Sequence, residues 1–531
     1  MKRIEDLNFG YNDAENYKRR ENKELFNHIF VRTNELDRLI APDTFFLMGE
    51  KGTGKTAYAV YLSNNNYRET SGVIRYIRET EYQKFIALKK EKQLNLSDYT
   101  NIWKVILYLI LAEIIHEKEA TNIVYRSFPK FKSLKDAIDE YYSNAFSPEI
   151  IQAIQFIEHS QSAAELISKY AKAGGEESYS ITFSESKFQT NLLYIQRKFE
   201  ETLRSLKLGR SHILFVDGID IRPAGIPYSD YLECIKGLAN AVWSMNNDFF
   251  PSIKDSKGRI KVVLLIRPDI FNSLGMQNQN NKIRDNSIYL NWQTTYMHHR
   301  TSPIFAVVDK LLMFQQCRKL ADGEAWDFYF PYKVKNLKTH EDTDDSFVEF
   351  LRHSYYRPRD FISMLRILQE NFNSRTDFSR DQFIAKDFDS GEFKHKYADY
   401  LLGELKDNLS FYYTNNDYEL FLKFFEYLNG KHNFDYDTYI DAFNRFEAFV
   451  QANSIVKPDF FETPDIFLQF LYELNVISFS EYVGDEVFVR WSFRERNVGN
   501  FSPKVKVGES YSVHRGLSRA LNTGRTIWRR S

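Results

Sequence analysis

Residues 45–62 read FFLMGEKGTGKTAYAVYL, which is a short apolar run, a glycine-rich turn and a segment able to continue as a helix. An apolar run of this length suits a buried strand, and glycines interrupt regular structure. The stretch therefore predicts a strand, a loop and a helix in succession. That order is typical of α/β domains built on a parallel sheet, so we expect such a domain around it.

The glycine-rich turn carries the chemistry of this stretch. Its octet matches GxxxxGK[ST], in which glycines let backbone N–H groups converge on an anion and the following helix adds its N-terminal dipole. The pattern predicts that Lys55 reaches the β- and γ-phosphates of ATP and that Thr56 coordinates Mg²⁺. The residues expected to bind the nucleotide are Gly49, Glu50, Lys51, Gly52, Thr53, Gly54, Lys55, Thr56 and Ala57.

A second apolar run, HILFVDGID at 212–220, ends in acidic residues. Asp217 is the expected metal-side carboxylate, because an NTPase needs one at the end of a strand to hold Mg²⁺. Many ATPases place a glutamate directly after this aspartate to polarise water, but Gly218 stands here. Asp220 can take that role or be a turn-forming acid. The other candidates for the base are Glu79 and Glu81, after a strand predicted at 73–79.

A third apolar run, KVVLLI at 261–266, leads into Arg267. Open α/β sheets bind ligands at the carboxyl edge of their strands, where this arginine falls. Arg267 is therefore a candidate to sense the γ-phosphate or to stabilise charge in the transition state. The alternative is that Arg267 forms an ion pair with Asp269 or Asp217.

Together these segments resemble the additional-strand class of P-loop ATPases, which includes AAA+ proteins and STAND signalling ATPases. The acidic strand and the later strand ending in arginine are similar to the STAND pattern, and YRPRDFISML at 356–365 is similar to an AAA+ sensor-2 helix. FGYNDAE at 9–15, the octet and RPRD at 357–360 jointly resemble a little-characterised bacterial P-loop ATPase family found among defence and stress-associated genes.

The resemblance implies nucleotide-dependent regulation, in which Arg359 is the sensor-2 residue that a lid brings onto the phosphates. Arg357 is the other candidate for this role. A purely structural role is the alternative, with Asp360 stabilising the first turn of a helix that begins at a proline. Arg300, Arg222 and Arg318 are candidates to act in trans if the protein oligomerises. The expected catalytic set is Lys55, Asp217, Asp220, Arg267 and Arg359, with Thr56 and Asp217 holding the metal.

A chain of 531 residues is long enough for two or three domains. We predict a lead-in at 1–40, then a three-layer P-loop NTPase core at 41–300. An insertion at about 82–205 is expected to be helical, with helices near 102–115 and 189–206 and a loop at 173–178. A helical lid at 301–372 and a mostly α, winged-helix-like domain at 373–531 follow, with a boundary at 373–386.

The C-terminal pattern predicts helices at 418–428, 438–450 and 464–475, then strands at 476–479 and 487–493, which is the winged-helix order. The third helix is expected to bury Ile466, Phe467, Phe470, Leu471 and Leu474. Its exposed face would then present Asp465, Gln469 and Glu473, which repel phosphates, so protein contact is favoured over duplex DNA. The alternative nucleic-acid contact is a basic tail at 504–530, with Lys504, Lys506, Arg515, Arg519, Arg525, Arg529 and Arg530 against Glu509 alone.

Composition is that of a folded protein, with 43% hydrophobic and 27% charged residues, and the net charge of −1 gives no global attraction to nucleic acid or acidic lipid. Two cysteines and a polar start at 1–26 favour the cytoplasm. The apolar stretch at 102–115 is shorter than a bilayer needs and is expected to be a core helix, so no membrane partner is predicted.

These observations predict a Mg²⁺-dependent ATPase that acts as a nucleotide-controlled switch or assembly factor, in bacterial defence or stress response, with slow hydrolysis. One alternative is an ATP-gated nucleic-acid-binding protein. The other is a nucleotide-binding scaffold with little hydrolysis. The expected partners are ATP and either a second copy of the chain or another protein.

Overall fold

The computed structural model of the chain describes residues 1–77, 96–119, 185–222, 226–254, 256–374, 380–484 and 486–524. These residues form two compact units. The parallel-sheet unit comprises Arg32–Glu50 and Lys55–Leu290. The helix-rich unit comprises Met1–Val31, Lys51–Gly54 and Asn291–Ser531. The chain therefore passes from one unit to the other at both ends of the glycine-rich loop.

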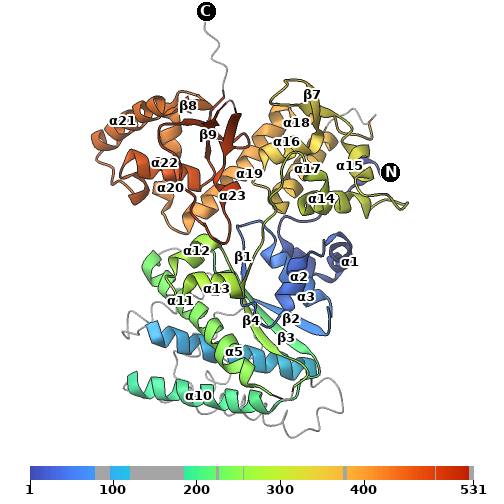
Figure 1. The fold of residues 1–531 in the computed structure, drawn as a ribbon, viewed down its shortest axis with the longest axis vertical. Helices are drawn as coiled ribbons and strands as arrows, with labels where there is room; N and C mark the ends of the chain where they lie inside the picture. The colour runs from blue at the N-terminus through green and yellow to red at the C-terminus, as the bar shows by residue number, and fades with distance from the viewer. Residues whose placement is uncertain are drawn as a thin grey trace, which may run out of the picture. The chain divides into compact units, whose positions relative to one another are not determined.

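The parallel-sheet unit is an α/β fold around a five-stranded sheet in the order β2-β3-β4-β1-β5 (Figure 1). All neighbouring strands run parallel. One strand, β4, lies between β1 and β3, so the strand before the glycine-rich loop and the acidic strand are not neighbours. The strands are β1 (Phe46–Met48), β2 (Thr70–Tyr76), β3 (Ser211–Asp217), β4 (Ile260–Ile266) and β5 (Ser287–Tyr289).

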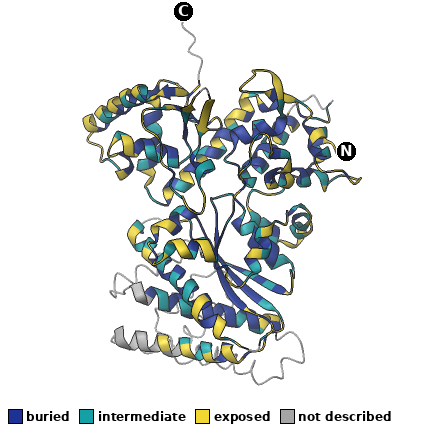
Figure 2. Cartoon of the chain, viewed as in Figure 1, coloured by how far each residue is buried: buried dark blue, intermediate teal, exposed yellow. Residues whose placement is uncertain are grey.

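The central strands consist of unbroken apolar runs because both faces of a parallel sheet are covered. Every residue of β1 and β4 is buried, and so is β3 after its first residue (Figure 2). The strands predicted at 45–48, 212–217 and 261–266 are confirmed. The strand predicted at 73–79 overlaps β2, which starts earlier, while positions 78 and 79 lie outside the described residues.

Helices cover the sheet on both sides (Figure 1). α3 packs against β2 and α2 against β5, while α11 packs against β4. α5 packs on α11, and α10 packs on α5. The bounds are α2 (Asn34–Ile40), α3 (Lys55–Asn64), α5 (Leu96–Glu119), α10 (Glu185–Ser205), α11 (Tyr228–Ser244), α12 (Pro268–Ser273) and α13 (Gln279–Asn286).

The predicted helical insertion is described only at its two ends, where α5 and α10 confirm the helices expected at 102–115 and 189–206. The loop predicted at 173–178 lies outside the described residues. By length and hydropathy alone, Tyr99–Glu119 of α5 is able to cross a membrane, and 72% of its most apolar window is buried inside the fold. The expected core helix is thus present, with Trp103 donating to the carbonyl oxygen of Cys234 in α11 at 3.2 Å.

The helix-rich unit begins with η1 (Ile4–Asp6), η2 (Ala14–Lys18) and α1 (Arg20–Ile29) and continues at α14. A two-stranded hairpin, β6 and β7, interrupts the region at 301–372 that was predicted as a helical lid. The elements here are α14 (Pro303–Met313), α15 (Glu324–Tyr329), β6 (Lys333–Lys335), β7 (Asp342–Asp345), α16 (Ser346–His353) and α17 (Pro358–Asn373).

The same unit ends in further helices and an antiparallel sheet in the order β10-β9-β11-β8. Thr463 accepts from the backbone N–H of Ile466 and Pro464 occupies the first helical position, as the sequence predicts for α22. The elements are α18 (Ala385–Phe388), α19 (Gly391–Ser410), α20 (Asn415–Phe424), η6 (Phe425–Leu428), β8 (Asn433–Asp435), α21 (Tyr436–Ala452), α22 (Pro464–Glu473), β9 (Ile477–Val483), β10 (Glu486–Arg490), α23 (Ser492–Glu495) and β11 (Ser510–Val513).

The predicted buried face of α22 is confirmed at Phe467 and Leu471 and wrong at Ile466. Ile466 is 42% exposed, and Leu468 and Tyr472 are buried, because the helix packs through 467/468 and 471/472. Gln469 and Glu473 do not form a free acidic face either. Gln469 donates to the carbonyl oxygen of Pro503 at 2.9 Å and accepts from the N–H of Val505 at 2.9 Å, so a following segment covers them.

Two predictions at the C-terminus need correction, although β10 confirms the presence of the last predicted strand. The strand predicted at 487–493 ends at Arg490, because Trp491 caps the short helix α23. The basic segment from Lys504 is not a free tail, since β11 pairs with both β9 and β8 and Lys506 pairs with Glu509 at 2.8 Å. Arg525, Arg529 and Arg530 lie outside the described residues.

Candidate functional site

The glycine-rich loop joins β1 to α3, in the order that the sequence predicts. Gly52 and Gly54 have φ values of +86° and +94°, a conformation that favours glycine. α3 begins at Lys55, so Thr56 and Ala57 lie in the first turn of a helix whose N-terminus follows the loop directly. A loop of this kind directs backbone N–H groups and a helix dipole at one point, which suits an anion.

Lys55 is buried at the base of the loop, with 7% of its surface exposed. Its ammonium group donates to the carbonyl oxygens of Gly49 at 2.9 Å and Glu50 at 3.3 Å. Burial lowers the pKa of Lys55, while the carboxylates of Asp220 and Asp217 oppose this shift. The residues around the loop thus place a desolvated cation next to two acidic groups.

Thr56 and Asp217 are brought together from α3 and β3. The Thr56 hydroxyl donates to Oδ2 of Asp217 at 2.6 Å, and the N–H of Gly218 donates to Oδ1 at 2.8 Å. Burial raises the pKa of Asp217 to about 6, and the nearby charge of Asp220 adds to this rise. A hydroxyl and a carboxylate side by side are oxygen ligands of the kind that Mg²⁺ prefers.

Gly218 explains why no glutamate follows Asp217. It has φ +86°, and a Cβ placed on it would lie 2.9 Å from the carbonyl oxygen of Ile77 at the end of β2. No side chain fits there without movement of the backbone, so an acidic group must come from elsewhere. Asp220 is half-buried and close enough for its charge to act on Lys55 and Asp217. Glu79 and Glu81 lie outside the described residues.

Arg267 caps α12 at the end of β4 and is 1% exposed. Its Nε donates to Oδ1 of Asp269 at 3.1 Å, and its Nη2 contacts Oδ2 of the same carboxylate. The ion pair considered from the sequence is therefore formed with Asp269. The charge of Arg267 still acts on Lys55, where it favours the neutral amine.

The tip of the loop, Lys51–Gly54, belongs to the helix-rich unit, and the two arginines of the RPRD box contact it there. Nη1 of Arg357 donates to the carbonyl oxygen of Lys51 at 3.0 Å. The N–H of Arg359 points at the carbonyl oxygen of Gly52 at 3.4 Å, and a Cβ on Gly52 would lie 3.2 Å from Cβ of Arg359.

The side chains of these two arginines have different partners. Arg357 is buried and forms a forked pair with Asp360, to which its Nη2 donates at 2.7 Å. Asp360 also accepts from the Tyr400 hydroxyl at 3.0 Å. Arg359 is half-buried and lies 3.3 Å from a carboxylate oxygen of Glu404, while its Nε donates to the carbonyl oxygen of Asn12 at 3.1 Å.

Several contacts of the loop had no signal in the sequence. Trp292 donates from its indole N–H to the carbonyl oxygen of Thr53 at 2.8 Å. Glu404 and Asp407 of α19 pair with Arg359 and Lys51. These residues are far from the loop along the chain, and no motif surrounds them, so only the tertiary fold brings them to it.

The arginines considered as trans-acting groups each have a local partner. Arg300 donates to Asp327 at 2.6 Å and also contacts Asp345. Arg318 pairs with Glu324 at 2.5 Å. Arg222 contacts the backbone of Ile226.

Comparison with other proteins adds no family. No protein-family model matches the chain, and no curated protein matches it. Within the described residues, no group of three or more His, Cys, Asp and Glu side chains could hold a metal ion by itself. The function must therefore be argued from the loop and the side chains around it.

Proposed function

We propose that the chain binds ATP with Mg²⁺ and acts as a slow ATPase switch. The observation that carries this proposal is the hydrogen bond of 2.6 Å between Thr56 and Asp217, beside the buried ammonium group of Lys55. The loop provides amides and a cation for phosphates, and the two oxygens provide ligands for the ion that accompanies them. The position of β4 between β1 and β3 supports the additional-strand class of P-loop ATPases.

The residues present fit Mg²⁺. Thr56 and Asp217 would hold it together with phosphate oxygens, and Mg²⁺ would neutralise negative charge that builds up on the phosphates. The raised pKa of Asp217 supports this assignment, because a buried carboxylate that lacks a cation is costly and a bound divalent ion relieves that cost. Lys55 would orient the β- and γ-phosphates, in keeping with its place in the motif.

Slow hydrolysis follows from the acidic groups. The position after Asp217 cannot hold a glutamate, so Asp220 is the best placed described carboxylate to orient a water molecule. Arg359 retains a partly exposed guanidinium group, whereas Arg357 and Arg267 are held by Asp360 and Asp269. We therefore keep Arg359 as the residue that responds to the γ-phosphate.

The helix-rich unit would supply the moving parts of the switch. The helices α14–α17 would act as the lid, since α17 begins directly after Arg357. The order α20, α21, α22, β9, β10 supports a winged-helix-like domain. Its hairpin exposes Tyr482, Val483 and Val487 by more than half, and such an apolar surface favours contact with a protein, either a second copy or a partner.

The alternatives rest on narrower observations. Arg515 and Arg519 remain exposed, which supports an ATP-gated nucleic-acid binder. Pairing of Arg267 with Asp269 supports a scaffold with little hydrolysis. Turnover that disappears in Asp220→Asn would exclude the scaffold and identify the base. A role in bacterial defence or stress response, in the cytoplasm, completes the proposal.

Lys55→Ala tests the proposal directly. ATP with Mg²⁺ at about 100 times its Kd stabilises a protein by about 2.7 kcal/mol, so the wild type should melt at a higher temperature with nucleotide. Lys55→Ala should lose the part of this protection that comes from the glycine-rich loop. Lys51→Ala is the matched control, because Lys51 belongs to the same octet but pairs with Asp407. Equal protection of Lys55→Ala and wild type would show that the assigned site is wrong.

A further inference from the structure

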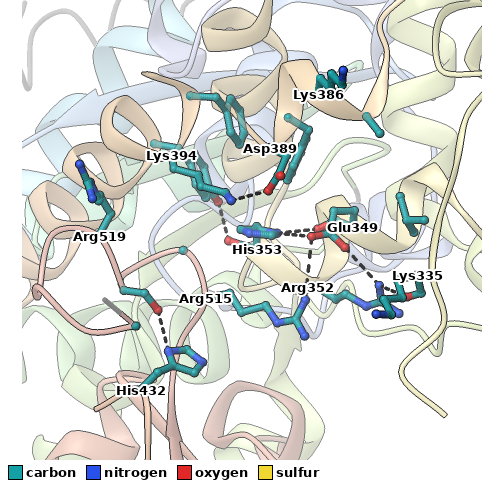
Figure 3. Close-up of a pocket in the computed structure, with 18 of the residues that line it drawn as sticks. Lys335, Glu349, Arg352, His353, Lys386, Asp389, Lys394, His432, Arg515 and Arg519 are labelled. Carbon is teal, nitrogen blue, oxygen red and sulfur yellow. Dashed lines mark hydrogen bonds and ion pairs between the residues drawn. The ribbon is translucent and has the colours of Figure 1, made fainter. Parts of the chain in front are cut away.

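The helix-rich unit contains a large open cavity that shares no residue with the glycine-rich loop (Figure 3). Its volume is about 930 Å³. The walls come from β6, α16, α18, the start of α19, the loop at His432 and the segment 515–524. Pockets for small molecules typically have volumes of about 300–1,000 Å³, so one ligand of nucleotide size fits.

Positive charge dominates the lining of this cavity. Seven lysines and arginines line it, against three carboxylates. Although the chain as a whole carries a charge of −1, this cavity therefore attracts anions. The cations are Lys333, Lys335, Arg352, Lys386, Lys394, Arg515 and Arg519, and the acids are Asp342, Glu349 and Asp389.

The acids neutralise only part of this charge. Arg352 pairs with Glu349 at 3.1 Å and with Asp344, outside the lining, at 2.7 Å. Lys394 pairs with Asp389, and Lys333 reaches Asp345 at 3.9 Å. Arg515 reaches Glu349 only at 3.9 Å. Within the described part of the chain, the charged ends of Lys335, Lys386 and Arg519 have no hydrogen bond or ion pair, and all three residues are exposed. Figure 3 shows Lys335, Lys386 and Arg519 on separate elements.

The histidines of the cavity do not add charge at neutral pH. Burial lowers the pKa of His353, and burial together with the charge of Arg515 lowers the pKa of His432. The Ser518 hydroxyl lies 2.9 Å from Nδ1 of His432 and joins the C-terminal segment to this wall. Available positive charge therefore comes from lysine and arginine.

Apolar groups line the same cavity. Phe388 and Phe393 are buried beside it, with ring centroids 4.4 Å apart, and Leu337 is 50% exposed. Cations alone would suit any anion, but cations beside apolar side chains suit a ligand with an organic part and several negative charges. Arginine forks match phosphate oxygens, and lysines add point charges.

We propose that this cavity binds an organic polyphosphate of nucleotide size through Lys335, Lys386, Arg515 and Arg519. This site is separate from the glycine-rich loop, so the chain would hold two phosphate-bearing ligands at once. The proposal does not depend on the function assigned to the loop.

The test uses full-length Lys55→Ala, in which the loop lysine is removed, and titrates it with ATP without Mg²⁺ and with inorganic tripolyphosphate by calorimetry. We expect one saturable site for each probe, tighter for ATP. Adding Lys386→Glu and Arg519→Glu should weaken ATP binding by about tenfold or more, since each replacement removes a cation from the cavity and puts a carboxylate in its place. The control adds Lys319→Glu and Lys504→Glu, which change the charge equally at exposed positions outside the cavity.

Three results would overturn the whole proposal, and a fourth would overturn its organic part. The first is that Lys55→Ala binds no ATP and that the wild type binds one ATP per chain or less. The second is equal weakening in the cavity variant and the control. The third is tighter binding of a single-stranded oligonucleotide than of ATP, which would make the cavity part of a nucleic-acid interface. Tripolyphosphate as tight as ATP would refute the organic part of the ligand.

The two proposals fail separately. The loop site is tested in a protein that already carries Lys386→Glu and Arg519→Glu. If ATP with Mg²⁺ raises the melting temperature of this protein equally with and without Lys55→Ala, the loop site is refuted. Loss of the cavity site shows in the calorimetric stoichiometry.

Discussion

At the scale of single residues, Arg357 and Arg359 differ in burial and in charge balance. Arg357 is 8% exposed, and burial opposes its charge, but Asp360 outweighs this and raises the pKa of Arg357. Arg359 is half-buried beside Glu404. The first arginine thus belongs to a buried ion pair that supports the loop tip, and the second has a freer cationic end.

Replacing each arginine should separate these roles. Arg357→Ala leaves Asp360 buried without its partner, so we expect a loss of stability of about 3–5 kcal/mol. Arg359→Ala should cost about 1 kcal/mol or less, because partly exposed pairs contribute little. Thermal unfolding without nucleotide measures both. An Arg357→Ala protein that melts like the wild type would contradict this assignment.

Arg359→Ala also bears on the proposed switch. Its main effect should be on ATP turnover with little change in melting temperature. Asp360 itself should behave like Arg357, since Asp360→Asn weakens the same forked pair.

At the scale of elements, the crossing of α5 and α11 depends on a glycine. A Cβ on Gly237 in α11 would lie 2.5 Å from Cβ of Tyr99 and 3.1 Å from its carbonyl carbon. Such a contact forces the two helices apart. The close approach explains a residue that otherwise lowers helix stability.

Gly237→Ala should therefore destabilise the parallel-sheet unit by about 1–3 kcal/mol, the usual cost of overpacking, despite the better helix propensity of alanine. Gly403→Ala is the matched control within α19, where no atom lies within 4 Å of the added Cβ. It should raise stability by about 0.5–1 kcal/mol. Thermal unfolding of both variants gives the comparison, and shifts of the same sign would refute the close-approach argument.

The C-terminal sheet contains a pH-sensitive contact at His514, which is 1% exposed. Its Nδ1 accepts from the N–H of Gly516 at 3.2 Å, and its ring lies 4.6 Å from that of Tyr355. Burial and the charge of His353 hold the pKa of His514 well below its ordinary value of 6.5. The folded state therefore favours the neutral ring.

Because the pKa is lower in the folded state, the unfolded chain binds the proton first as the pH falls. The neutral ring of His514 makes its full contribution to the free energy of unfolding above about pH 6.5. Below that pH the free energy of unfolding falls by about 1.4 kcal/mol per pH unit for this histidine. Hydrogen exchange of β9 and β11 amides between pH 5 and 7.5, corrected for intrinsic rates, measures this slope. His514→Asn should flatten it, while His395→Asn, at an exposed position, should not. An unchanged slope in His514→Asn would refute the assignment.

Elements with strong local signals could be predicted from the sequence, and those that depend on tertiary pairing could not. β3 and β4 are unbroken apolar runs, and the octet fixes the start of α3. β5 has three residues and exists because it pairs with β1. Trp491 ends the predicted last strand by capping α23, and no local pattern announces it.

The candidate site divides in the same way. Lys55, Thr56, Asp217 and Asp220 follow from motifs at strand ends, and the structure brings them together. Glu404 lies on α19, which lacks any motif, so its pairing with Arg359 could not be anticipated. The buried face of α22 could be predicted only in part, because Leu468 is as apolar as Ile466 and only tertiary packing decides which of the two is covered.

At the scale of the whole molecule, residues 1–31 belong to the helix-rich unit, although the chain then continues through the parallel-sheet unit. Gln369 in α17 donates to the carbonyl oxygens of Ile4 at 2.8 Å and Leu7 at 2.7 Å. Lys310 in α14 donates to the carbonyl oxygen of Phe30 at 2.7 Å. These contacts join the two separated stretches of one unit.

Deleting residues 1–31 should therefore weaken one unit selectively. Amide protection in α14 and α17 should fall, while β3 and β4 keep theirs, as measured by hydrogen exchange. Gln369→Ala is a milder variant that leaves two carbonyl groups without their donor. It should lower the stability of the helix-rich unit by about 1–3 kcal/mol. Equal loss of protection in both units would contradict the division.

The division of the chain also has a consequence for its synthesis. Residues 32–290 contain all of the parallel-sheet unit, so that unit can fold while the ribosome is still working. Residues 1–31 must wait until their partners in α14 and α17 have emerged, which takes on the order of tens of seconds at about 5–20 residues per second. During that time Tyr17 and Phe26, buried in the finished protein, lack most of their unit. Until then the first segment exposes apolar side chains, which makes the nascent chain prone to aggregation.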